Sequence, residues 1–134
     1  GIAWHPYPEG LSDPNFEDDG KATNNENSLI INMKNLNVLT DYLQKPEYLS
    51  PSGKVRHLIL SEQGFNATNE DVQADQIAKA YDIAKNNPYV EAFFLPGEMH
   101  NVGGALQEMH FGLKDAYERG GRERKAYSVY KSLQ

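Results

Sequence analysis

The 134-residue sequence contains no cysteine and no long apolar segment. Without cysteine the chain can form neither a disulfide scaffold nor a thiolate metal site, and it offers no cysteine nucleophile. No apolar run approaches the roughly 20 residues that span a bilayer, and the first four residues lack the basic flank and apolar core of a signal peptide. These absences predict a soluble chain with no membrane partner.

Basic residues are also few. Lys and Arg number 13 against 19 Asp and Glu, which gives a formal net charge of -6, and no dense Lys/Arg run occurs. This balance disfavours nucleic acid as a partner, because binding to phosphates depends on clustered basic side chains. The acidic run Glu17-Asp18-Asp19-Gly20 lacks the alternating ligands of an EF-hand loop and is typical of a solvated turn. We predict no metal site and no cofactor.

The length lies in the range of independently folding domains, and we expect a single domain over residues 1–134. Gly1 already begins a strand-like stretch, so a mature amino terminus, an expression boundary and a piece of a longer protein all stay open. Alternation of strand-like and helix-like segments favours parallel strands joined by right-handed crossovers. The expected elements are strands at 2–5, 55–61 and 89–95, a surface loop at 9–28, and helices at 28–44, 66–87 and 122–133.

The apolar residues of the expected helices repeat at spacings of three and four. On the first helix this stripe begins at Leu29 and continues to Leu43. On the second helix, Asn, Thr and acidic residues at 66–71 provide the amino-terminal cap, and Pro88 follows its end. The side expected to be buried in this second helix consists of Val72, Ala74, Ile77, Ala78, Tyr81 and Ala84.

The strand at 55–61 ends in the segment Leu60-Ser61-Glu62-Gln63-Gly64-Phe65. An apolar strand followed at once by a carboxylate places that acid at the carboxyl end of a buried parallel strand, where α/β proteins collect binding and catalytic groups. Glu62 is therefore the first candidate catalytic residue. The alternative is that Glu62 is a solvated loop residue or a cap partner.

Aromatic, imidazole, carboxylate and amide side chains occur at the carboxyl ends of all three expected strands. If the strands are parallel, their exits share one rim, where aromatic faces and hydrogen-bonding side chains suit a sugar. Each has an ordinary alternative, because Trp4 can fill core, either imidazole can be satisfied by backbone groups and Tyr7 can cap a loop. The predicted site comprises Glu62 as catalytic residue and Trp4, His5, Tyr7, Gln63, Glu98 and His100 as carbohydrate-binding residues.

Glycoside hydrolysis offers a specific role for paired acids on such a rim. A retaining mechanism needs two carboxyl groups roughly 5 to 5.5 Å apart, and an inverting one needs about 6.5 to 9.5 Å. Glu62 suits the nucleophile by its position after a strand. Glu98 and Glu9 are the candidates for the second acid.

The same residues carry a resemblance. The segment Leu60-Ser61-Glu62-Gln63-Gly64-Phe65 resembles the seventh-strand nucleophile motif of (β/α)8-barrel glycoside hydrolases. Residues 4–8 resemble a sixth-strand exit, and residues 125–131 are similar to a last barrel helix. More narrowly, the Glu-Gln-Gly-Phe motif, the Gln- and Ala-rich helix that follows it and the Gly-Leu pair before the last helix resemble the carboxyl-terminal part of the glycoside-hydrolase-like DUF5722 family. This resemblance implies a partial (β/α)8 barrel and a retaining mechanism with Glu62 as nucleophile. For an enzyme that degrades polysaccharides, secretion or a periplasmic location would follow.

The resemblance also shows what this chain lacks. In such barrels the acid/base Glu follows an Asn after the fourth strand, and no segment here corresponds to it; nor does a Trp follow the third expected strand, at residues 95–100. A complete barrel takes roughly 250 residues, whereas this chain supplies about three of eight strand–helix units. Open sheet edges favour association. We therefore expect the remaining part of the barrel, or a second copy of the chain, as a partner.

Two alternatives to a hydrolase are a non-catalytic module and a flavodoxin-like domain. A non-catalytic carbohydrate-binding or structural module would keep the scaffold without turnover. A flavodoxin-like domain would need a phosphate-binding glycine loop after the first strand, and the Pro6-Tyr7-Pro8 segment there removes the amides that would hold an anion.

Overall fold

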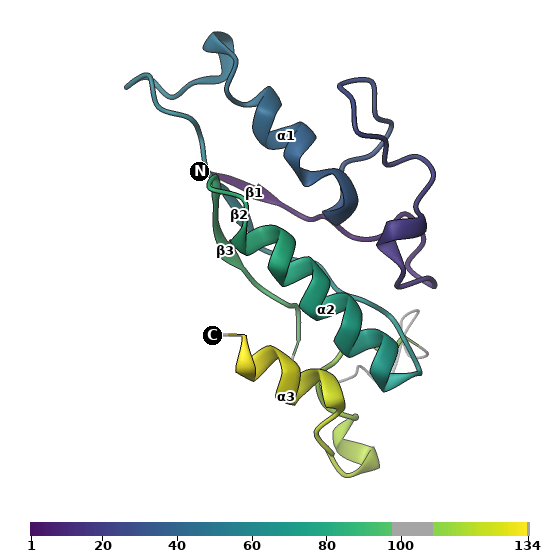
Figure 1. Ribbon diagram of the computed structural model, residues 1–134. Helices are drawn as coiled ribbons and strands as arrows, with labels where there is room; N and C mark the ends of the chain where they lie inside the picture. Colours follow the sequence, from purple (N-terminus) through teal and green to yellow (C-terminus); the bar gives the residue numbers. More distant parts are fainter. Residues whose placement is uncertain (98–108, 134) are drawn as a thin grey trace.

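A computed structural model describes residues 1–97 and 109–133 of the chain. Its three strands pair side by side, and both pairs are parallel, as expected. Trp4 pairs with Leu60, and Leu60 pairs with Phe93, so the three strands end at the same edge (Figure 1). The strands are β1 (Ile2–Trp4), β2 (Leu58–Leu60) and β3 (Val90–Phe93), in the order β1-β2-β3.

Helices connect and follow these strands. The crossover from β1 to β2 contains α1, the crossover from β2 to β3 contains α2, and α3 closes the described chain beside α2 (Figure 1). None of the helices in the described residues combines the length and the apolar character that a membrane span requires. The helices are α1 (Leu36–Tyr42), α2 (Glu70–Lys85) and α3 (Lys125–Ser132), with short 3-10 turns η1 (Phe16–Asp18), η2 (Met33–Asn35), η3 (Pro46–Tyr48) and η5 (Tyr117–Arg119).

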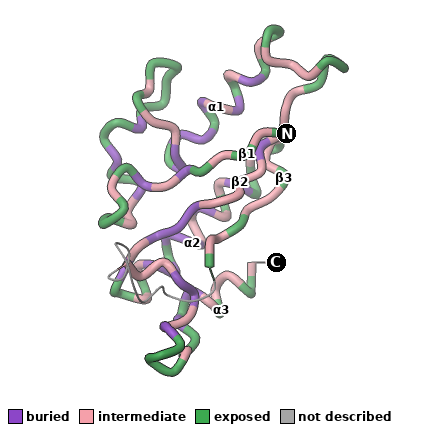
Figure 2. Tube along the Cα trace, turned by 180° about the vertical axis from the view of Figure 1, so that it is seen from behind, coloured by how far each residue is buried: buried purple, intermediate pink, exposed green. Residues whose placement is uncertain are grey.

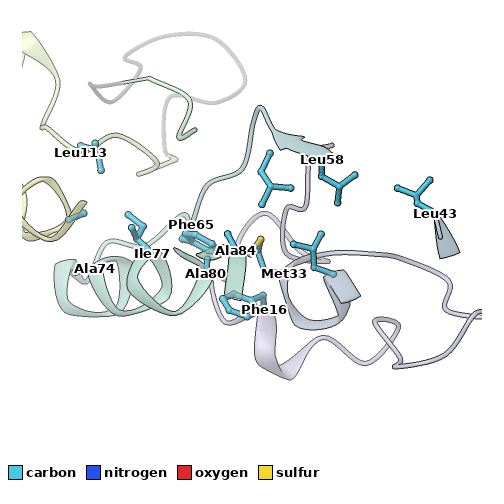
Figure 3. Packing of buried hydrophobic residues seen from close by; sticks show 13 residues of the cluster. Phe16, Met33, Leu43, Leu58, Phe65, Ala74, Ile77, Ala80, Ala84 and Leu113 are labelled. Atoms are coloured by element: carbon cyan, nitrogen blue, oxygen red, sulfur yellow. The ribbon is translucent and has the colours of Figure 1, made fainter. Parts of the chain in front are cut away.

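Only one face of the sheet is covered by these helices. Leu58 and Leu60 of β2 are fully buried and belong to one apolar cluster with residues of α1 and α2 (Figure 3). Viewed from the opposite side, the strands lie in front of α2 (Figure 2). On that uncovered face Ala3 is exposed, and its partner Ile59 and the next partner Ala92 are half-buried. Among the described residues, the sheet therefore has a packed side and a bare side, which no helix covers.

The long segment 9–35 is ordered although only six of its residues, in η1 and η2, are helical. Phe16 is buried and packs its ring against Phe65, with centroids 5.7 Å apart (Figure 3). Asp19 is also buried, and its carboxylate accepts hydrogen bonds from the Glu9 backbone N–H and the Asn32 side chain. The acidic run thus contributes a structural carboxylate, and its neighbour Glu17 pairs with Lys79 of α2 at 2.7 Å.

The first helix begins later than the sequence pattern predicts. Asn32 and Asn35 form a reciprocal capping box at η2, so the chain turns there and α1 starts only at Leu36. Such local side-chain hydrogen bonds give the backbone an alternative to helix. Leu29 consequently lies outside the helix and is 79% exposed, so its assignment to the buried stripe was wrong.

The second helix was expected at nearly its observed position, but two polar residues of its buried side were missed. Asn69 caps it, accepting from the backbone N–H groups of Asp71 and Val72. Gln73 and Gln76 are both buried, whereas Val72 is only half-buried. A side chain with both donor and acceptor groups is buried at low cost only where partners are present.

Gln73 has a full set of partners. Its Nε2 donates to the carbonyls of His110, Phe111 and Gly112 at 3.0–3.2 Å, and its Oε1 accepts from Arg124 Nε at 2.9 Å. Arg124, itself buried, also donates to the Ala67 carbonyl at 2.7 Å. These hydrogen bonds attach the segment that follows residue 108 to α2 and to the start of α3.

We predict that Gln73→Leu destabilises the fold by about 2–4 kcal/mol, because it removes the buried acceptor of Arg124 Nε and the amide group that donates to three carbonyls. Gln76→Leu is the matched control, since Gln76 Oε1 has no hydrogen-bond partner among the described residues and its Nε2 has only Glu17, at 3.4 Å. This control should change stability by less than about 1 kcal/mol. Urea unfolding measures both, and equal effects of the two substitutions would contradict the assignment.

Glu70 links the first turn of α2 to the start of α3. Its carboxylate accepts from the Arg122 guanidinium and from the Lys125 backbone N–H at 3.0 Å. The Arg122 hydrogen bond, followed by that of Lys125, lowers the pKa of Glu70 from 4.5 to about 2. A carboxyl with a depressed pKa stabilises the fold above its unfolded pKa, and this contribution is lost as the pH falls through the folded pKa.

We therefore predict that Glu70→Gln lowers the melting temperature at pH 6–7 by roughly 2–5 °C, and that this difference shrinks between pH 4.5 and 2, the two pKa values of the group. Thermal unfolding followed by circular dichroism at stepped pH tests this. Glu47→Gln serves as the control, because its carboxylate has no ion pair or hydrogen bond among the described residues. A difference that stays constant with pH would contradict the role of the charge.

Candidate functional site

The candidate site lies at the edge where the three strands end. β1 continues into His5, Pro6 and Tyr7, and β2 continues into Ser61 and Glu62. Because the strands are parallel and in register, these exits leave the sheet side by side. The rim residues of β1 and β2 therefore meet, as the sequence predicts.

Tyr7 and Glu62 make the central contact of this rim. The Tyr7 hydroxyl donates a hydrogen bond of 2.8 Å to Glu62 Oε1, and both side chains are half-buried. Burial, the hydrogen bond to Glu62 and its charge together raise the pKa of Tyr7, in that order of importance. Tyr7 therefore stays protonated and remains a donor at neutral pH. Among the described residues, the second carboxylate oxygen of Glu62 accepts no hydrogen bond.

His5 and Ser61 form a second pair beside the first. The His5 Nε2 atom lies 3.1 Å from Ser61 Oγ, and His5 is exposed. His5 and Tyr7 follow β1, whereas Ser61 and Glu62 follow β2. Each of the two contacts therefore joins the exit of β1 to the exit of β2. Ser61 was not among the predicted binding residues, although its place directly before Glu62 could have indicated it.

The side chains of Trp4 and Gln63 both donate hydrogen bonds to backbone carbonyls of other segments. Trp4 lies in the register row of Leu60, which faces the helices, and its indole N–H donates to the Ile31 carbonyl at 3.3 Å. Gln63 is fully buried, and its Nε2 donates to the Phe94 carbonyl, so it ties the exit of β2 to that of β3. Gln63 is fully buried and Trp4 half-buried, whereas His5 is exposed. Contact of Trp4 and Gln63 with a sugar stays a prediction.

The third exit is only partly described. Glu98 and His100, both predicted to bind carbohydrate, lie outside the described residues. Phe94 follows β3 and is 53% exposed. On the other side of residues 98–108 the chain returns to the rim, where the His110 backbone N–H donates to Asn66 Oδ1 at 2.6 Å.

Asn66 and Phe111 hold the rim loops together, and neither was singled out from the sequence. Asn66, in the loop after β2, also donates through Nδ2 to the Leu11 carbonyl at 3.0 Å. Phe111 packs its ring edge-to-face on Tyr7, with centroids 6.0 Å apart. No local sequence signal marks Phe111, because its partners are about 50 and 100 residues away.

The chemistry of this rim is that of an oriented carboxylate beside neutral hydrogen-bonding groups. A phenol that donates to one carboxylate oxygen fixes the plane of the carboxylate and leaves the other oxygen for a ligand. In the part of the chain that the structure describes, no three His, Asp or Glu side chains gather as a set of metal ligands.

Comparison with known proteins is consistent with the fold. A family 39 glycoside hydrolase from the gut symbiont Bacteroides cellulosilyticus WH2 is similar in structure, with a TM-score of 0.69 and 20% sequence identity. The match covers 99% of this chain and 26% of that chain, so this chain spans about a quarter of the length of the hydrolase. The mixed α/β fold with its parallel sheet thus resembles a fragment of a glycoside hydrolase.

A search among curated proteins found no match. The sequence profile of DUF5722, described as a family of unknown function, matches residues 1–134, the whole chain. The chain belongs to the DUF5722 family.

Proposed function

We propose that this chain contributes a glycoside-hydrolase-like active site, in which Glu62 is the nucleophile of a retaining mechanism once a barrel is complete. The observation that carries the proposal is the 2.8 Å hydrogen bond from Tyr7 to Glu62 at the carboxyl edge of a parallel sheet. The structural likeness to a family 39 glycoside hydrolase supports it at the level of the fold. The neighbouring His5 and Ser61 supply hydrogen-bonding groups suited to sugar hydroxyls.

In this mechanism the free oxygen of Glu62 attacks the anomeric carbon while the glycosidic carbon–oxygen bond breaks. A second carboxyl group gives its proton to the leaving oxygen and later takes a proton from the water that releases the sugar from Glu62. Tyr7 holds the other Glu62 oxygen, so the attacking oxygen is fixed in direction. Orientation of this kind supplies part of the rate enhancement of an enzyme.

Glu9 does not fit the second carboxyl group. It pairs with Lys21 Nζ at 2.5 Å, and the hydrogen bonds from Lys21 lower its pKa. A general acid at neutral pH needs a raised pKa, so the environment of Glu9 acts in the wrong direction. We assign the second carboxyl group to a strand other than β1 and β2, with Glu98 as the candidate within this chain.

The bare side of the sheet supports a partial barrel. Ala3, Ile59 and Ala92 share a register row and face away from α1 and α2, as residues lining a barrel interior would. β1 and β3 are both edge strands of the described sheet, and open edges invite pairing with further strands. We propose that the remaining part of the barrel, or a second copy of the chain, covers this face and both edges.

For the partial barrel, we expect the isolated 134-residue chain to self-associate in multi-angle light scattering at micromolar concentrations. Ile59→Lys should yield a lower mass, because a charge on the bare face opposes its burial. Leu29→Lys is the control, since Leu29 is exposed in the loop, and it should leave the association unchanged. A stable monomer of the unsubstituted chain, dispersed without any partner, would count against the proposed barrel.

For the activity, we expect a mechanism-based 2-fluorosugar to label Glu62 covalently in the longest form of the protein that its gene encodes. Glu62→Gln should abolish labelling and lower turnover by roughly a thousandfold or more, because the nucleophile is lost. Peptide mass spectrometry locates the label, and Glu118→Gln, on η5, is the control that should be labelled normally. Sugar binding that survives Glu62→Gln, with no turnover by the parent protein, would instead identify a non-catalytic binding module.

A further inference from the structure

Phe111 lies between the backbone of β2's exit and the Tyr7 ring. A Cβ atom on Gly64 would lie 2.8 Å from Phe111 Cδ1 and 3.4 Å from Cε1, so the Phe111 ring rests directly on the glycine. The same ring meets Tyr7 edge-to-face, with an interplanar angle of 81°. Phe111 therefore fills the space that a side chain at position 64 would take, and it contacts the residue that holds Glu62.

The glycine is needed for this contact and not for the backbone. The positive-φ glycines of the described chain do not include Gly64, so its backbone conformation is open to other residues. A position two residues after Glu62 is thus kept without a side chain by an aromatic ring from residue 111. Position 64 requires glycine because a side chain there would overlap the Phe111 ring.

Hydrogen bonds with α2 and with the loop after β2 hold the backbone at His110 and Phe111. The Phe111 carbonyl accepts a hydrogen bond of 3.0 Å from Gln73 Nε2 of α2, and the adjacent His110 N–H is bound by Asn66. A continuous set of contacts leads from α2 through Phe111 to Tyr7 and ends at Glu62 Oε1. Tyr7 follows Pro6 and precedes Pro8 in a loop, so its ring direction depends on such packing.

We propose that Phe111 is a positioning residue for Glu62: its ring, resting on Gly64, holds Tyr7 in the orientation from which the hydroxyl reaches the Glu62 carboxylate. The catalytic consequence rests on the function proposed above. The geometric part does not, because the state of the Tyr7 hydroxyl can be measured without a substrate. A ring that merely filled volume would affect stability and leave this hydroxyl unchanged.

The test follows the ionisation of Tyr7 by NMR in protein labelled with ¹³Cζ-tyrosine, with the signal assigned by Tyr7→Phe. In the parent chain Tyr7 should remain protonated at pH 10, where an ordinary tyrosine is half ionised. In Phe111→Leu the titration should move down toward the ordinary value, because the hydroxyl gains water and loses Glu62. Phe111→Tyr, which keeps the ring, should retain the behaviour of the parent.

The matched control is Phe93→Leu. Phe93 is half-buried and forms an edge-to-face pair with Tyr81, with ring centroids 5.8 Å apart. This substitution should lower the melting temperature without moving the Tyr7 titration. If Phe111→Leu likewise lowers the melting temperature and leaves Tyr7 unchanged, the positioning role is overturned.

Gly64→Ala tests the same contact by changing the glycine, and it replaces Phe111→Leu if that variant does not fold. The added methyl must displace the Phe111 ring, so Tyr7 should again ionise at lower pH; an unchanged Tyr7 titration would overturn the proposal. In the longest form of the protein, Phe111→Leu should slow labelling of Glu62 by roughly tenfold, the effect of one hydrogen bond to a charged group. If Tyr7 responds but the parent protein is never labelled, the hydrolase proposal fails and the positioning contact stands.

Discussion

The parallel, in-register pairing of three strands is the constraint on which the rest of this structure depends. Parallel strands need long crossovers, and both crossovers place their helices over the same face of the sheet. Leu58 and Leu60 of β2 are buried beneath them. The same chain direction brings residues 5–7 beside residues 61–62. The candidate site and the bare face thus have one common cause.

Around this sheet, buried polar groups fix positions that apolar packing would leave less defined. Gln73 and Arg124 satisfy each other and four backbone carbonyls between them. Asn66 connects the loops that follow β1 and β2 with the segment at His110. Hydrogen bonds have defined directions, whereas apolar contacts tolerate sliding. The rim is therefore attached to the helices at specific atoms.

Much of the architecture could be predicted from the sequence, because strand and helix periodicities differ and their alternation implies parallel pairing. The placement of Glu62 at a strand end also follows from its local sequence. The Tyr7–Glu62 contact could not be predicted, since it joins residues 55 positions apart through a proline-containing loop. The sequence also does not specify which face of the sheet the Trp4 side chain takes. The late start of α1 depends on capping by Asn32 and Asn35, which the apolar stripe does not reveal.

The polar anchoring of segment 9–35 bears on how this rim would select a ligand. The buried carboxylate of Asp19 and the capping amides of Asn32 and Asn35 order the segment through its own side chains. The segment begins two residues after Tyr7, and its Leu11 carbonyl accepts a hydrogen bond from Asn66 in the loop after β2, so this border of the rim is preformed. A preformed border loses little conformational entropy on binding, but it also adapts little to a different shape. Recognition here would favour a narrow range of geometries over tolerance of many.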